Sequence, residues 1–337
     1  MSEAMLERAM GGAEAALEGE TARSVDAVVA TERPRVVRPP IGQVQPPPYR
    51  QHRVDRALAQ RQLPRGDLSP FQRWFRLSFS RTVSTLVMKT WFRVKVVNPE
   101  RFQTGPALYC FNHLSWMDTL LLLATFPRKP QLYMYGPKQA DIHKGGKNRF
   151  MWWTGVPVPF SPLKDDMLTS VRRAQAVFDS GGVLGIAPEG AIHVHEGDLL
   201  PFEEGAAYLA LRAGVPIVPV AITGTSWARF RGQVLLRLGE PIPTGERPTR
   251  EVVSRYSAWA WHAIRAMVDG DRDGPPPGRI GRWFTDVFND WGEGGREAAS
   301  LRRGPDPADV PYGPADVPYQ PADVPYQPAS QEDAGAA

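Results

Sequence analysis

Short apolar runs of strand length alternate with helical segments through the middle of the chain, and this pattern limits the possible folds more than any other feature. The apolar runs lie at 107–111, 131–135, 183–187, 215–223 and 234–238. The segments with helical periodicity lie at 119–126, 166–178, 206–213 and 250–267. Strands without alternating polar residues are typical of a sheet that helices cover on both faces. We therefore expect an α/β domain with a largely buried sheet flanked by helices.

The two ends of the chain lack this pattern. Residues 1–68 form a basic, proline-rich tail that we expect to be disordered. Residues 69–268 then make up the folded domain, and residues 269–337 hold a C-terminal helix followed by a second disordered tail. In that tail the sequence Pro-Ala-Asp-Val-Pro-Tyr occurs three times, every seven residues from Pro307. Two prolines in each repeat oppose both a helix and a sheet ladder, which favours disorder.

Positive charge is concentrated near the start of the expected domain. Between Glu32 and Val97 there are 14 Lys or Arg against 3 Asp or Glu, although the whole chain has a net charge of only +4. Within this block, residues 70–94 contain no acid and place aromatic side chains at helical spacing. A cationic helix with an aromatic side suits the interface of an anionic membrane. The alternative is a helix that packs on the core and has a solvated basic face.

We expect the basic region to bind anionic lipid rather than nucleic acid. The membrane contact is expected to be peripheral and on the cytoplasmic face. The longest apolar run, around residues 120–124, is far shorter than the ~18–20 residues of a membrane-spanning helix. The start of the chain lacks the basic stretch and apolar core of a signal peptide. A single cysteine, Cys110, suits a reducing compartment.

The first site candidate is the loop directly after the 107–111 strand, which contains His113 and Asp118. A histidine with a pKa near neutrality suits removal of a proton from a hydroxyl group, and a carboxylate beside it would orient the imidazole. Five residues along a regular helix are ~140° out of phase, so we expect a loop that folds Asp118 back onto His113. Ser115 is too close to His113 in the chain for a Ser-His-Asp triad. The spacing alone is weak evidence for a catalytic pair, because a solvated histidine followed by an acid at a helix start gives the same pattern.

Further motifs follow in order along the chain. They are Pro188-Glu189-Gly190, Leu199–Ala210 (LLPFEEGAAYLA), Val215–Thr225 (VPIVPVAITGT) and Leu238–Ile242 (LGEPI). Together with Asn112–Asp118 (NHLSWMD), this series resembles the glycerolipid acyltransferase family, which includes the 1-acylglycerol-3-phosphate acyltransferases and other lysophospholipid acyltransferases. The resemblance covers roughly residues 70–268.

The resemblance implies an α/β fold with a mixed sheet, an acyl-CoA or acyl-carrier-protein donor, a lipid-derived acceptor, and no metal or other cofactor. It implies that His113 is the catalytic base and that Asp118 is its partner. The chain is therefore expected to be an O-acyltransferase of membrane lipid synthesis or remodelling. On the same ground we assign substrate binding to Asn112, Lys138, Glu189, Gly190 and Gly205.

Cations that the resemblance leads us to expect are absent from this chain. Ser161, Ile192 and Glu203 stand where basic residues would suit an acceptor phosphate, because arginine matches the geometry of phosphate oxygens. Lys138 is a cation that remains. We therefore expect 1-acylglycerol-3-phosphate to be a poorer acceptor than a lysolipid whose headgroup is neutral, zwitterionic or sugar-based.

Two other classes of function stay open. One is a catalytically silent lipid-binding protein. The other is a metal-dependent hydrolase, since His193 and His195 flank a single residue and could bind zinc with His113, Asp118 or Asp198. The plainer interpretation of the two histidines is that their imidazoles form local hydrogen bonds.

Overall fold

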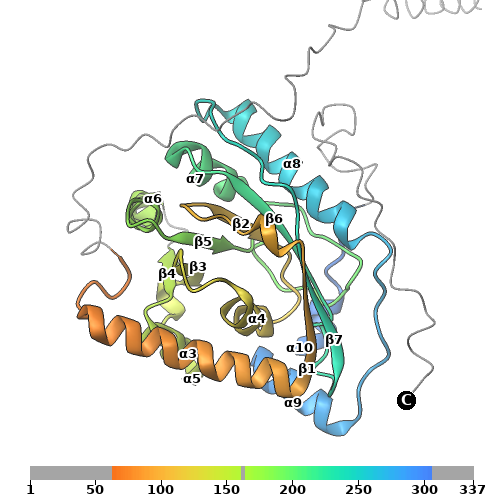
Figure 1. Cartoon of the computed structure of the whole chain (residues 1–337). Helices are drawn as coiled ribbons and strands as arrows, with labels where there is room; N and C mark the ends of the chain where they lie inside the picture. Colours follow the sequence, from red (N-terminus) through yellow and green to blue (C-terminus); the bar gives the residue numbers. More distant parts are fainter. Residues whose placement is uncertain (1–62, 161–163, 306–337) are drawn as a thin grey trace, which may run out of the picture. The chain divides into compact units, whose positions relative to one another are not determined.

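A seven-stranded sheet forms the centre of the protein. The structure, a computed structural model, describes residues 63–160 and 164–305 (Figure 1). Its strands are β1 (Phe92–Val97), β2 (Leu108–Phe111), β3 (Leu132–Lys138), β4 (Pro157–Phe160), β5 (Val183–Ile186), β6 (Ile217–Thr223) and β7 (Gly232–Leu238). Their order is β1-β7-β6-β2-β5-β3-β4. Neighbours are parallel except for the antiparallel pair β6–β7, so the sheet is mixed, as expected.

Helices cover both faces of this sheet. They are α3 (Pro70–Trp91), α4 (Met117–Thr125), α5 (Gly145–Thr154), α6 (Lys164–Asp179), α7 (Gly205–Ala213), α8 (Arg250–Val268), α9 (Arg279–Asn289) and α10 (Gly295–Ser300), with short 3-10 turns η1 (Pro99–Arg101) and η2 (Gln139–Asp141). Side chains of α6, α7 and α8 share one core cluster with the sheet. Side chains of α3, α4, α5 and α9 share the second cluster, on the other face. The predicted α/β architecture is confirmed, and Figure 1 shows both helical layers.

The predicted helix at residues 70–94 is three residues too long. It begins with a capping box between Ser69 and Gln72, and it ends at Trp91. Phe92 is already extended, and it pairs with Gly232 in the first register position of β1. The sequence FRVKVV is rich in β-branched residues and buries Phe92, so pairing with β7 prevails over continuation of the helix.

The packed part of the chain continues to residue 305, beyond the expected boundary at residue 268. The Asp271 carboxylate receives two hydrogen bonds from Arg237 of β7, at 2.7 and 2.9 Å. Gly197 packs directly on the same segment, because a Cβ atom there would lie 2.3 Å from the Asp271 carbonyl oxygen. Farther on, the Gly304 N–H donates to Asp198 at 3.0 Å. Two helices, α9 and α10, lie in this segment where the sequence predicted one.

Several predictions fall outside the described residues. They are the basic tail up to residue 62, the proline-rich repeat from Pro307, and the missing cation at Ser161. Among the helices that the structure describes, none combines the length and apolar character needed to cross a bilayer.

Candidate active site

Residues of the candidate site follow three neighbouring strands of the sheet. His113 comes after β2, Glu189 after β5 and Thr225 after β6. These strands are parallel, so their carboxyl ends meet at one edge of the sheet. Such an edge is where α/β proteins place reacting groups.

The structure brings His113 and Asp118 together. Asp118 lies in the first turn of α4, and its Oδ2 is 2.9 Å from Nδ1 of His113. The same oxygen accepts the backbone N–H groups of Leu114 at 2.9 Å and Ser115 at 3.0 Å. The Thr225 hydroxyl donates to the other oxygen, Oδ1, at 2.6 Å. The carboxylate is fully buried, and these donors fix its position.

The orientation of the imidazole follows from this carboxylate. Asp118 already accepts three other hydrogen bonds, so its contact with Nδ1 of His113 requires that Nδ1 carry the proton. The neutral ring then has its lone pair on Nε2. The His113 side chain is 23% exposed, whereas Asp118 is 0% exposed. The pair can therefore accept a proton from a group that arrives from solvent.

Ser115 takes no part in this pair. Its hydroxyl donates to Oδ1 of Asn289 at 3.2 Å and accepts the Met117 N–H at 3.2 Å. The hydroxyl thus holds the loop between His113 and Asp118 against α9, and the sequence argument against a triad agrees with this geometry.

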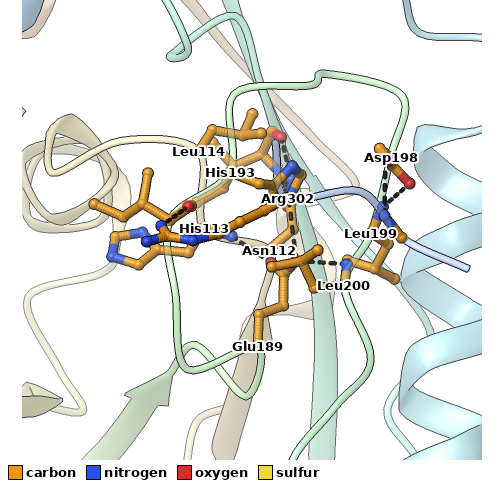
Figure 2. A network of polar contacts seen from close by, with 12 residues as sticks. Asn112, His113, Leu114, Glu189, His193, Asp198, Leu199, Leu200 and Arg302 are labelled. Carbon is orange, nitrogen blue, oxygen red and sulfur yellow. Dashed lines mark hydrogen bonds and ion pairs between the residues drawn. The ribbon is translucent and has the colours of Figure 1, made fainter. Parts of the chain in front are cut away.

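Glu189 ties three loops together from inside the protein (Figure 2). Its Oε1 accepts the backbone N–H of His113 at 2.7 Å, and its Oε2 accepts that of Leu200 at 2.8 Å. Nε2 of His193 lies 3.0 Å from the same Oε2, although off the line of a directed hydrogen bond. The Glu189 side chain is 0% exposed, so its carboxylate positions the site from behind, whereas the sequence assigned it to substrate binding.

Asn112 and Gly190 also shape the backbone around the site. The Asn112 amide donates to the Ile222 carbonyl at 2.8 Å and accepts the Ile222 N–H at 2.7 Å, which extends the pairing of β2 with β6. Gly190 has a φ of 66°, a left-handed conformation that glycine adopts without strain. This turn brings the segment after Glu189 back toward the site. Sequence analysis had predicted substrate contacts for both residues.

Lys138 and Gly205 lie farther from His113. Lys138 is exposed at the end of β3, and β5 separates β3 from β2, so two strand spacings of ~5 Å lie between them. Gly205 is the exposed first residue of α7, where an added Cβ atom would meet nothing within 4 Å. Lys138 faces solvent as a substrate-binding cation would, but neither residue forms part of the His113 network.

Glu196 is a third buried carboxylate, and it was not among the predicted site residues. It accepts the Gly224 N–H at 2.7 Å, the Ser226 N–H at 3.1 Å, and the Ser226 hydroxyl. These bonds hold the loop that presents Thr225 to Asp118. Burial raises the pKa of Glu196 above its ordinary value. Its acidic side chain next to His195 was the signal in the sequence, but the partner loop lies about thirty residues away.

His193 and His195, which flank Val194, contact different partners. His195 has Nδ1 at 2.8 Å from Asp273 and Nε2 at 2.9 Å from the Ser300 carbonyl. His193 faces Glu189: burial lowers its pKa, but the contact with and charge of Glu189 outweigh burial and raise the pKa overall. In the described part of the chain, no group of three His, Cys, Asp or Glu side chains is arranged to hold a metal ion. His195 thus forms the local hydrogen bonds of the plainer interpretation, whereas His193 contacts Glu189 without a directed hydrogen bond.

An arginine from the C-terminal segment stands beside the loop where the sequence lacks a cation. The Arg302 guanidinium donates to the Ile192 carbonyl at 2.6 Å (Figure 2). The next residue, His193, donates its backbone N–H to the His113 carbonyl at 3.1 Å. Arg302 is exposed, so its remaining N–H groups are open to a ligand. No sequence pattern indicated this residue, which lies 110 positions from Ile192.

Comparison with known proteins shows which protein family this chain is similar to. Residues 93–223 match the family model described as "Acyltransferase". The chain is 32% identical over 193 residues to human 1-acyl-sn-glycerol-3-phosphate acyltransferase beta, covering 49% of this chain and 64% of that protein. It is 27% identical over 173 residues to the 1-acyl-sn-glycerol-3-phosphate acyltransferase of Saccharomyces cerevisiae, covering 49% and 56%. The chain thus spans less than two thirds of the length of these curated relatives.

One solved structure is also similar. It is the crystal structure of the 1-acyl-sn-glycerophosphate (LPA) acyltransferase from Thermotoga maritima, with a TM-score of 0.46 and 21% identity. The match covers 58% of this chain and 79% of that one.

Proposed function

We propose, from the match of residues 93–223 to the acyltransferase family model, that the protein is an O-acyltransferase of membrane lipid synthesis. It moves a fatty acyl group from a thioester to the free hydroxyl of a 1-acylglycerol-3-phosphate or a related lysolipid. The observation that carries the proposal is the buried Asp118 carboxylate, 2.9 Å from the imidazole of His113, whose side chain is 23% exposed.

The chemistry follows from the tautomer of His113. Nε2 takes the proton of the acceptor hydroxyl while that oxygen attacks the thioester carbonyl carbon. Asp118 stabilises the imidazolium that forms. When the tetrahedral intermediate collapses, the carbon–sulfur bond breaks and the leaving thiolate takes the proton back from Nε2. The products are an ester and a free thiol, and no acyl-enzyme is needed.

The donor is acyl-CoA or acyl-carrier protein, because both present the same thioester to the attacking hydroxyl. We expect neither a metal nor an organic cofactor, since the base and its carboxylate complete the proton transfers. The thioester is a co-substrate.

A phosphate on the acceptor is supported by the curated relatives, whose names specify 1-acyl-sn-glycerol-3-phosphate. The sequence argument against this acceptor rested on absent cations, among them the one at Ile192. Arg302 supplies a cation beside that residue, and Lys138 is a second one on the same edge of the sheet. Because a phosphate monoester needs fixed cations, we propose a phosphate-bearing acceptor for this site.

An anionic membrane surface on the cytoplasmic side is the proposed location. The first half of α3 exposes Phe71, Trp74 and Phe75 by 70%, 62% and 50%. Farther along the same helix, a groove of about 420 Å³ is lined by Arg81, Lys89 and Arg128, among other residues. Aromatic side chains beside cations suit the boundary between lipid headgroups and acyl chains.

The test is thiol release by the purified full chain with vesicle-borne lysolipids. His113→Ala should reduce turnover by ~10²–10⁴-fold, the usual contribution of a general base. His143→Ala is the matched control, because His143 is exposed and lies outside the site. Near wild-type turnover by folded His113→Ala protein would refute the mechanism. A wild-type protein that binds vesicles but releases no thiol with any lysolipid would instead support the silent lipid-binding alternative.

A further inference from the structure

Helix α9 exposes an apolar stripe that its packing does not require. Ile280, Trp283 and Val287 are exposed by 69%, 59% and 48%. Their spacing of three and four residues places them on one side of the helix. Scattered apolar residues are normal on a surface, but three large ones in a row along a helix indicate a contact.

The buried side of α9 already anchors the helix. Phe284 and Phe288 pack against the core cluster below the sheet. The Thr285 hydroxyl is buried and accepts the Ala228 N–H at 2.9 Å. Because this side is fixed, the helix cannot rotate its exposed stripe inward, and the stripe remains open on the described part of the protein.

Aromatic contacts connect α9 to the end of α3. The Trp91 ring, at the last residue of α3, lies 4.5 Å from the Phe284 ring and 5.3 Å from the Phe230 ring, measured between centroids. Phe230 is itself 67% exposed. Figure 1 shows α3 and α9 along the same lower side of the domain. The exposed apolar groups of α9 therefore continue from the helix that we place at the lipid surface.

The charges on α9 lie beside the apolar stripe. Arg279, Arg282 and Asp286 are all exposed and lie on the side of the stripe away from Phe284. A helix with an apolar sector, a tryptophan and flanking arginines suits the plane of an anionic bilayer. We propose that α9 is a second lipid-contacting helix, which seats Ile280, Trp283 and Val287 in an anionic bilayer. This inference rests on the proposed function for the presence of a lipid substrate.

The last residue of α9 connects this contact to the active site. Oδ1 of Asn289 accepts the Trp116 N–H at 2.9 Å and the Ser115 hydroxyl at 3.2 Å. Both donors lie in the loop between His113 and Asp118. Lys147 of α5 holds the same end of the helix, since its ammonium group donates to the Phe288 carbonyl at 2.9 Å. A bilayer that fixes α9 therefore also fixes the loop that carries the base, and Asn289 is the positioning residue.

A depth measurement tests the lipid contact without depending on turnover. Trp283→Cys is labelled with an environment-sensitive fluorophore in the full chain, where Cys110 is buried. The matched control is Glu251→Cys, exposed on α8 on the other face of the sheet. With phosphatidylglycerol vesicles that contain brominated lipid, we expect quenching of the label at 283 and none at 251. Equal signals, or none at 283, would overturn the proposal while leaving the enzymatic function to its own test.

A protein segment that covered the apolar stripe in place of lipid would give a different quenching result. If another part of the chain or a second copy covers α9, iodide without vesicles should fail to quench the label at 283, and dilution would separate these two cases. Either result counts against a lipid contact. Ile280→Gln combined with Val287→Gln should weaken vesicle binding about tenfold, because both apolar side chains lose their burial in lipid.

The coupling to the active site has a separate readout. Asn289→Leu removes the acceptor of two hydrogen bonds, so kcat with vesicle-borne acceptor should fall about tenfold while vesicle binding stays unchanged. Asn289→Asp keeps an acceptor oxygen and should restore most of the kcat. An unchanged kcat in folded Asn289→Leu protein would contradict the coupling, and a loss that Asp fails to restore would reduce Asn289 to a general stabilising role.

Discussion

The backbone N–H of His113 donates to the Glu189 carboxylate at 2.7 Å, across 76 residues of sequence. Asp118 fixes the ring of the same histidine through Nδ1. Two buried carboxylates thus hold the proposed base, one by its main chain and one by its side chain. Neither needs to touch the substrate to determine where Nε2 points.

Glu189→Gln should therefore damage the site without removing any group that contacts substrate. The amide has one acceptor oxygen, whereas the carboxylate serves His113 and Leu200 on separate oxygens, so one buried N–H would face an NH₂ group. We expect a loss of about 1–3 kcal/mol in the free energy of unfolding, together with a lower kcat. Denaturant titration and thiol release measure the two effects. Glu203→Gln, exposed on the adjacent loop, is the control, and equal behaviour of the two variants would contradict this role.

Thr225→Val should lower kcat about tenfold with a small change in KM, because Asp118 loses the donor at 2.6 Å that helps to orient its carboxylate. Thr125→Val makes the same substitution at the far end of α4 and should leave the kinetics near wild type. A Thr225→Val enzyme with wild-type kcat would show that the remaining donors orient the carboxylate unaided.

Arg302→Gln should discriminate between acceptors. Removal of its charge should raise KM for 1-acylglycerol-3-phosphate about tenfold or more, since hydrogen bonds to charged groups are the stronger ones. KM for a lysolipid with a choline-capped phosphate should change far less. Arg303→Gln, at the exposed residue that follows Arg302, is the control. Equal effects on both acceptors would favour the prediction from the sequence, in which the preferred acceptor has a neutral, zwitterionic or sugar-based headgroup.

Gly197→Ala should destabilise the protein by several kcal/mol, because the new Cβ atom would lie 2.3 Å from a backbone oxygen of the C-terminal segment. Gly205→Ala, where a Cβ atom has open space, should leave stability unchanged. Thermal unfolding compares the two. If Gly205→Ala raises KM for the acceptor, the substrate-binding role predicted for Gly205 gains support. A stable Gly197→Ala protein would show that the segment after α8 packs less closely than described.

The stability of the protein should fall as pH rises through the titration of His193. Burial lowers the pKa of this imidazole, but Glu189 outweighs burial and raises the folded-state value above 6.5. The folded state then keeps a proton that the unfolded chain has already lost. This contribution is complete below pH 6.5 and disappears as pH rises through the folded-state pKa. Denaturant midpoints across a pH series should show this step in wild type and not in His193→Gln, and its persistence in the variant would assign the step to another group.

The sequence by itself determined the five central strands of the sheet, most helix positions and the pairing of His113 with Asp118. These features depend on residues close together in the chain, where apolar periodicity and a five-residue spacing leave few arrangements. The sequence failed where local preferences competed with packing, as at Phe92, which extends β1 where helix α3 was expected to continue.

Tertiary structure alone decided which polar residues complete the site. Glu189 and Asn112 are turned inward because buried backbone groups of distant segments need their hydrogen bonds. Thr225 and Arg302 reach the site from positions more than a hundred residues away from their partners, and α9 reaches it through Asn289. No local pattern encodes such contacts, because they arise only when the sheet places the ends of its strands side by side and the C-terminal segment folds back over them.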